Sequence, residues 1–167
     1  MDGYFEEYLE TISGLVKIIF HPEKGVYRIS LPALKALKKN VVTNRHLCLP
    51  WDRLADDLNN YFRGEDIFFD YPLDLSGYSV FQIKVLRAVQ RIPYGKTISY
   101  SGLAVASGYT PDYRRAVGRV MAVNRTPLLI PCHRVVGANG ETGGYSGGRE
   151  WKDYLLKLEG LKEFSQE

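Results

Sequence analysis

The chain has 167 residues, of which 45% are hydrophobic, so it can form one ordinary domain or two small ones around a buried core. It holds two cysteines, Cys48 and Cys132, which excludes a disulfide framework and favours a protein of the reducing cytoplasm. No apolar stretch is long enough to span a membrane, so we expect a soluble protein. The net charge of +3 is unevenly distributed, because residues 1–75 carry 9 Lys/Arg and 12 Asp/Glu whereas residues 76–167 carry 13 and 7.

The first part of the sequence predicts a small α/β domain. Residues 15–20 and 25–29 are apolar runs separated by turn residues, which is typical of two strands. A helix is expected over residues 51–62, because apolar residues repeat there at helical spacing. None of these residues has catalytic spacing, so we expect residues 1–75 to form a supporting domain.

Three further features of the sequence concern the first domain and its boundary. His46 and Cys48 could supply half of a metal site, but no second pair completes the ligand set, so no metal is expected. Residues 1–7 are acidic and lack the apolar core of a signal peptide. Proline and glycine within residues 71–77, together with the change in charge balance, indicate a boundary between domains 1–75 and 76–167.

The second domain predicts a helix-turn-helix. A first helix is expected over residues 79–91, followed by a short extended segment at residues 97–98. A serine then caps a helix over residues 99–107, and a Thr-Pro pair starts another that runs over residues 111–123. Two helices joined by a short glycine-containing turn form a helix-turn-helix pattern.

The helix over residues 111–123 has two faces at helical spacing. The core side is expected to hold Tyr113, Val117, Val120 and Met121, and the other face Arg115, Gly118, Arg119 and Ala122. A glycine inside a helix lowers helix stability by about 1 kcal/mol relative to alanine. Close approach to a nucleic-acid backbone, or close packing against another helix, would explain why Gly118 is present despite this loss. Nine basic residues and one acid lie between Lys84 and Arg134. A solvated basic face is one interpretation of such a run, but its one-sidedness favours a polyanionic partner, most simply nucleic acid.

The apolar run over residues 130–136 carries the strongest chemical signal. A run of this length is typical of a buried strand, in which a cysteine is most often inert packing. Here Cys132 is followed by His133 and Arg134, and a nearby base or positive charge favours the thiolate form that attacks carbon. We therefore interpret Cys132 as a reactive nucleophile. Beyond it, a glycine-rich loop over residues 143–148 suits a wall that closes over a planar ligand, and a helix is expected over residues 150–161.

The segment Pro131-Cys132-His133-Arg134-Val135 resembles the active-site signature of the O6-alkylguanine-DNA alkyltransferases, and similar flanking segments extend the resemblance over residues 81–160. The resemblance implies an α+β protein whose small N-terminal domain precedes a helix-turn-helix or winged-helix-like domain. It also implies a cofactor-free monomer that repairs double-stranded DNA containing O6-alkylguanine by moving the alkyl group irreversibly to Cys132. Whether O4-methylthymine is also a substrate stays open.

The resemblance also assigns roles to residues of this sequence. Cys132 would accept the alkyl group, and His133 would act as its base through a bridging water, since adjacent residues of a strand point to opposite faces. Asn124 would order the site, Glu159 would orient the imidazole, and Tyr100 would donate a proton to guanine. The positions that match substrate-pocket residues are Val135, Tyr145, Ser146, Met121 and Lys152.

On the helix over residues 111–123, Arg115 matches the arginine that fills the gap left by the extruded nucleotide, and Gly118, Arg119 and Ala122 lie on the same DNA-facing side. The chain departs from the family at Gly144, where many relatives have a polar residue, and it lacks the zinc ligands of some relatives. Two alternative functions are a lesion-binding module without chemistry and a cysteine hydrolase with a Cys132–His133 dyad. The first does not need the cysteine, and the second leaves the basic segment unexplained.

Overall fold

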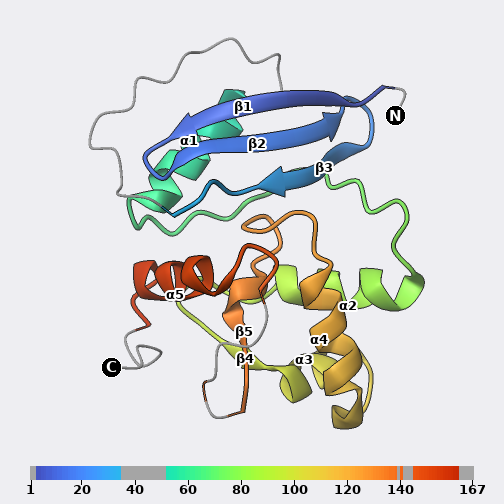
Figure 1. Ribbon diagram of the computed structural model, residues 1–167. Helices are drawn as coiled ribbons and strands as arrows, with labels where there is room; N and C mark the ends of the chain where they lie inside the picture. The colour runs from blue at the N-terminus through green and yellow to red at the C-terminus, as the bar shows by residue number, and fades with distance from the viewer. Residues whose placement is uncertain (1–2, 35–51, 139, 141–144, 162–167) are drawn as a thin grey trace. The chain divides into compact units, whose positions relative to one another are not determined.

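The computed structural model describes residues 3–34, 52–138, 140 and 145–161, and the chain divides into two compact units, Met1–Asp74 and Leu75–Glu167 (Figure 1). The mixture of strands and helices is the α+β class expected from the sequence. The predicted His46–Cys48 half-site and Gly144 lie outside the described residues. No helix in the described part of the chain has the length and apolar character needed to cross a membrane.

The first unit is an antiparallel sheet in the order β1-β2-β3, with one helix packed against it (Figure 1). The strands are β1 (Phe5–Thr11), β2 (Gly14–His21) and β3 (Gly25–Ser30), and the helix is α1 (Asp52–Phe62). The predictions for β2, β3 and α1 are confirmed, whereas β1 was not predicted. The sequence of β1, FEEYLET, shows little alternation of apolar and polar residues. In the structure Phe5 at its start is 55% exposed, whereas Leu9 is buried.

The end of the first unit is anchored to β3 by backbone hydrogen bonds. Val26 N donates to Pro72 O at 2.8 Å, and Asp74 N donates to Val26 O at 2.9 Å. Gly25 makes this approach possible, because a Cβ at that position would lie 2.2 Å from Pro72 O and its φ is +99°. The segment that precedes the boundary is therefore an ordered part of the first unit.

The second unit is mainly helical. Its elements in chain order are α2 (Val80–Gln90), β4 (Ile98–Ser99), α3 (Tyr100–Ala106), the 3₁₀ turn η1 (Pro111–Tyr113), α4 (Arg114–Ala122), the 3₁₀ turn η2 (Cys132–Arg134), β5 (Val135–Val136) and α5 (Arg149–Leu158). Local capping defines the helix starts, as a capping box of Ser79 and Gln82 opens α2 and the Ser99 side chain accepts from Gly102 N before α3. The predicted helix-turn-helix is α3 followed by α4.

Two expectations about the second unit were wrong. Residues 130–136 do not form one strand, because Cys132–Arg134 make a 3₁₀ turn and only Val135–Val136 pair, in parallel, with β4. Tyr113 does not lie on the core side: it is 46% exposed, because the chain begins this segment as a 3₁₀ turn that shifts the side chain toward Phe81 and Tyr109. Val117, Val120 and Met121 are buried as predicted.

Candidate active site

Cys132 lies in a turn that follows the loop after α4, and its side chain is buried. Pro131, at φ −77° and ψ 63°, forms an inverse γ-turn in which Cys132 N donates to Ile130 O at 2.7 Å. Proline suits this position because its ring fixes φ and it has no N–H to satisfy. The turn directs the thiol into the interior of the second unit rather than along a strand.

The Asn124 side chain holds the thiol in place. Its amide nitrogen donates to Cys132 Sγ and to Ile130 O, both at 3.0 Å. The Asn124 carbonyl oxygen accepts from Thr126 N at 3.1 Å, which fixes the orientation of the amide. The Thr126 hydroxyl also donates to the Asn124 carbonyl oxygen at 3.4 Å, and the Thr126 carbonyl oxygen accepts from Ile130 N at 2.9 Å. No local sequence pattern indicated this contribution of Thr126 to the site.

Burial dominates the acidity of the thiol. It raises the pKa of Cys132, while hydrogen bonds from Asn124 and Ser146 and the charge of Lys152 act in the opposite direction. Ser146 Oγ lies 4.0 Å from Cys132 Sγ. Since the resting thiol is held in its protonated form, its activation requires a base that takes the proton as reaction begins.

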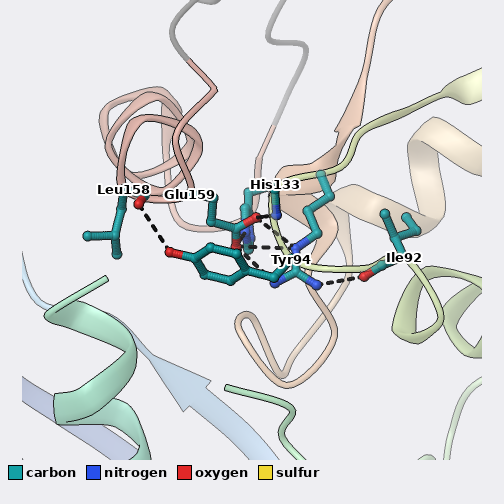
Figure 2. Close-up of polar contacts among 7 residues, drawn as sticks. Ile92, Tyr94, His133, Leu158 and Glu159 are labelled. Atoms are coloured by element: carbon teal, nitrogen blue, oxygen red, sulfur yellow. Dashed lines mark hydrogen bonds and ion pairs between the residues drawn. The ribbon is translucent and has the colours of Figure 1, made fainter. Parts of the chain in front are cut away.

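His133 is buried and paired with Glu159, which caps the C-terminal end of α5 (Figure 2). His133 Nε2 and Glu159 Oε1 are 2.8 Å apart. Burial lowers the pKa of His133, so the imidazole is neutral and donates its Nε2–H to the carboxylate, which places the lone pair on Nδ1. Tyr145 presents its ring edge-on to His133, with ring centroids 6.4 Å apart. His133 therefore has the protonation state of a base.

Arg134 does not lie where the sequence suggested. Its position next to His133 predicted a cation that favours the thiolate, but its guanidinium is bound to Glu159 and to Ile92 O. The cation that lowers the pKa of the thiol is Lys152. Arg134 points away because residues of a 3₁₀ turn project in different directions around it.

Lys152 connects several of the predicted pocket residues. It is fully buried on α5, its Nζ donates to Val135 O at 2.6 Å, and it lies 5.9 Å from the centroid of the Tyr100 ring. Burial lowers the pKa of Lys152 to about 8. Burial raises the pKa of Tyr100, and the thiolate form of Cys132 would act in the same direction, so this phenol keeps its proton beside the nucleophile.

Tyr145 is also buried, and burial raises its pKa well above the ordinary value. Met121 is buried on α4, the helix that precedes the Asn124 loop. The structure thus brings together, within the second unit, the predicted catalytic and pocket residues Cys132, His133, Glu159, Asn124, Tyr100, Val135, Tyr145, Ser146 and Lys152. Met121 is connected to them through its backbone, since its carbonyl oxygen accepts from Asn124 N at 3.3 Å.

The four residues predicted to face DNA lie apart from the thiol on the outer side of α4. Arg115, Arg119 and Ala122 are exposed, and Gly118 is half-buried. A Cβ on Gly118 would make an ordinary 3.8 Å contact with the Tyr100 ring, so packing inside the protein does not require glycine there. Within residues 3–34, 52–138, 140 and 145–161, no three His, Cys, Asp or Glu side chains come together as metal ligands.

The pairing of Glu159 predicts a loss of stability in acid. Burial raises the pKa of Glu159, but the hydrogen bonds and charges of His133 and Arg134 outweigh it and bring the pKa to about 2, from an ordinary 4.5. A carboxyl with a lowered folded-state pKa stabilises the protein above pH 4.5, and this contribution, on the order of 3 kcal/mol, is lost as pH falls from 4.5 to 2.

Urea unfolding of wild type and Glu159→Gln at a series of pH values measures this term. At pH 6 the variant should be several kcal/mol less stable, because it also leaves the buried Arg134 unpaired. The difference should shrink steadily below pH 4.5. A gap that is the same at pH 6 and pH 3 would contradict the assignment of the titrating carboxyl to Glu159.

Comparisons with known proteins now add to this geometry. Residues 80–161 match the model of the 6-O-methylguanine DNA methyltransferase DNA-binding domain. A methylated-DNA–protein-cysteine methyltransferase of Mycolicibacterium paratuberculosis is 48% identical over 105 residues, which are 63% of this chain and 62% of the relative. The match therefore spans less than two thirds of that relative. A probable methyltransferase of the same name from Acanthamoeba polyphaga mimivirus is 38% identical over 92% of this chain and 95% of its own.

Solved structures agree with these matches. The crystal structure of Mycobacterium tuberculosis OGT in complex with DNA aligns with a TM-score of 0.75 and 32% identity, covering 94% of this chain and 92% of that one. The O6-methylguanine-DNA methyltransferase of Pyrococcus kodakaraensis aligns with a TM-score of 0.64 and 26% identity over 94% and 99% of the two chains. The likeness extends over both units of the chain.

Proposed function

The chain belongs to the 6-O-methylguanine DNA methyltransferase family, and from this premise we propose that it repairs alkylated DNA as a methylated-DNA–[protein]-cysteine S-methyltransferase. Its substrate is duplex DNA containing O6-alkylguanine, and the alkyl group moves to Cys132. The observation that carries the proposal is the buried thiol held by Asn124 beside a neutral His133 paired with Glu159. Every residue of the proposed reaction comes from one copy of the chain, so a monomer is sufficient for it.

The reaction begins with extrusion of the damaged base, since the alkylated oxygen is unreachable inside the duplex. The outer face of α4 enters the minor groove, where Gly118 and Ala122 allow close approach and Arg119 meets the backbone. Arg115 fills the gap that the extruded nucleotide leaves. Residues 76–167 thus bind DNA and carry the chemistry, and residues 1–75 support them.

The extruded guanine enters the pocket formed by Met121, Val135, Tyr145, Ser146 and Lys152. The Cys132 proton passes toward His133 through a bridging water, and the sulfur attacks the alkyl carbon. The carbon–O6 bond breaks as the carbon–sulfur bond forms, and the departing guanine takes a proton from Tyr100. The Tyr100 phenol retains its proton until the carbon–O6 bond breaks, because burial raises the pKa of Tyr100. Return of the proton from His133 to Tyr100 through solvent restores both residues. The thiol proton then replaces the alkyl group on guanine in the net reaction, so atoms and charge balance.

The thioether product makes the reaction stoichiometric. None of the described side chains around Cys132 is a nucleophile able to cleave a carbon–sulfur bond at neutral pH, since those that contact the thiol are an amide and a hydroxyl. Each molecule should therefore react once. Incubation with excess DNA carrying labelled O6-methylguanine should reach a plateau at about one methyl group per protein. Continued turnover past that plateau would contradict the proposal.

A further inference from the structure

Arg134 is a buried cation whose contacts have no place in the proposed reaction. Its Nε donates to both oxygens of Glu159, at 3.2 and 3.0 Å, and its Nη2 donates to Oε1 at 2.9 Å. Its Nη1 donates to Ile92 O at 2.6 Å, and the guanidinium lies 5.8 Å from the centroid of the Tyr94 ring. A planar guanidinium that meets a carboxylate in this way fixes the orientation of the carboxylate as well as its charge.

Glu159 is held from three sides (Figure 2). Besides the bonds from Arg134, its Oε1 lies 2.8 Å from His133 Nε2, and its Oε2 accepts from Gly95 N at 3.0 Å. Tyr94 reinforces the arrangement, because its hydroxyl donates to Leu158 O at 3.1 Å, one residue before Glu159. The segment between α2 and β4, the turn that carries Cys132 and the end of α5 therefore meet at one carboxylate.

His133 and Arg134 share this carboxylate, and the sharing affects His133. A carboxylate whose charge faced only an imidazole would favour the protonated ring, which cannot accept a proton. The Arg134 guanidinium donates to both oxygens of Glu159 and offsets the charge of this carboxylate. The described charged groups that shift the pKa of His133 are Glu159 and Lys152, from the end of α5 and from α5 itself, and Arg134, from the same turn as His133. The Tyr145 ring, from the loop before α5, packs edge-on against the imidazole.

We propose that Arg134 is a positioning residue that keeps His133 neutral and correctly oriented by binding the Glu159 carboxylate that both residues share. It acts through Glu159 and does not touch the thiol. Its effect on alkyl transfer rests on the proposed function, but its effect on the titration of His133 does not. Burial lowers the pKa of His133, the charges of Arg134 and Lys152 act in the same direction, and Glu159 opposes them.

The alternative is that the Arg134 charge lowers the pKa of His133 directly, independently of Glu159. A double-mutant cycle separates the two. The variants are Arg134→Gln, Glu159→Gln and the double variant. Arg149→Gln is the control, because Arg149 is an exposed residue of the same unit and forms an ion pair with Asp153 on α5. The chain has three histidines, and His133→Gln identifies the His133 ring signals in the NMR spectrum.

Arg134→Gln should raise the pKa of His133 by one unit or more, which is a tenfold or greater increase in proton affinity. The acid limb of the pH–rate profile for alkyl transfer should shift upward with it, and a higher pH should restore the rate. In the Glu159→Gln background, Arg134→Gln should change the pKa of His133 by less than about 0.3 unit, which is a twofold change in proton affinity. Arg149→Gln should change neither quantity.

Arg134→Gln leaves Glu159 buried without its strongest partner and is expected to be the least stable variant. If it does not fold, Arg134→Lys carries the same comparison, since a lysine keeps the charge but cannot form the fork, and it should raise the pKa of His133 by a smaller amount. An unchanged His133 titration in a folded Arg134 variant would overturn the proposal. An equal effect with and without Glu159 would overturn it in favour of direct action. If wild type transferred no alkyl group, the proposed function would fail while the titration still decided the role of Arg134.

Discussion

Cys132→Ala should abolish alkyl transfer and leave the affinity for duplex DNA within about twofold of wild type. The thiol is buried in the second unit, whereas the side chains proposed to meet DNA lie on the exposed face of α4. Asn124 keeps its bond to Ile130 O when the sulfur is lost, so the loop should retain its shape. Labelled-methyl transfer and fluorescence anisotropy with the same duplex measure the two properties separately.

Cys132→Ser is the matched control, because its hydroxyl preserves an acceptor for Asn124 but is a far weaker nucleophile at neutral pH. Intact-mass measurement should show a gain of one methyl group in wild type and none in either variant. This result also separates the alternative functions. A lesion-binding module would gain no mass even as wild type, and a cysteine hydrolase would release product repeatedly. Methylation that persists in Cys132→Ala would place the acceptor elsewhere in the chain.

Arg115→Ala should slow methyl transfer from duplex DNA by at least one order of magnitude and have little effect on the reaction with free O6-benzylguanine. Extrusion of a base costs a few kcal/mol of stacking and pairing, and a side chain that replaces the base offsets part of that cost. The free base requires no extrusion, so it reports only on the thiol and the pocket. Single-turnover rates at saturating DNA measure the effect without a contribution from binding.

Arg119→Ala is the control for Arg115→Ala, since it removes the same charge from the same exposed face of α4. If Arg119 contacts one phosphate, its loss should weaken binding and reduce the slope of log K against log salt by about 0.9. The rate at saturating DNA should change little. If Arg115→Ala slowed the free-base reaction as much as the duplex reaction, Arg115 would be a pocket or folding residue. The hypothesis that α4 is the DNA-reading helix would then be rejected.

The sequence by itself determined those features that depend on neighbours in the chain. Ser79 and Ser99 cap their helices through backbone N–H groups three residues away, and Pro111 begins the segment that leads into α4. Cys132 followed by His133 was enough to indicate a nucleophile with a base. The strand β1 escaped prediction because its pairing with β2, rather than an apolar pattern of its own, makes it a strand.

The tertiary structure decided everything that depends on contacts across the chain. Arg134 and Glu159 are 25 residues apart, and Lys152 and Val135 are 17 apart, so no local pattern indicates that their side chains meet. The residues after Ile130 look like a strand because they are apolar, but the inverse γ-turn at Pro131 and the bonds from Asn124 make them a turn. An apolar run indicates that a segment is buried, and both a strand and a turn can be buried, so the run does not distinguish them. Which of the two forms depends on the partners that the rest of the fold supplies for the backbone and for polar side chains.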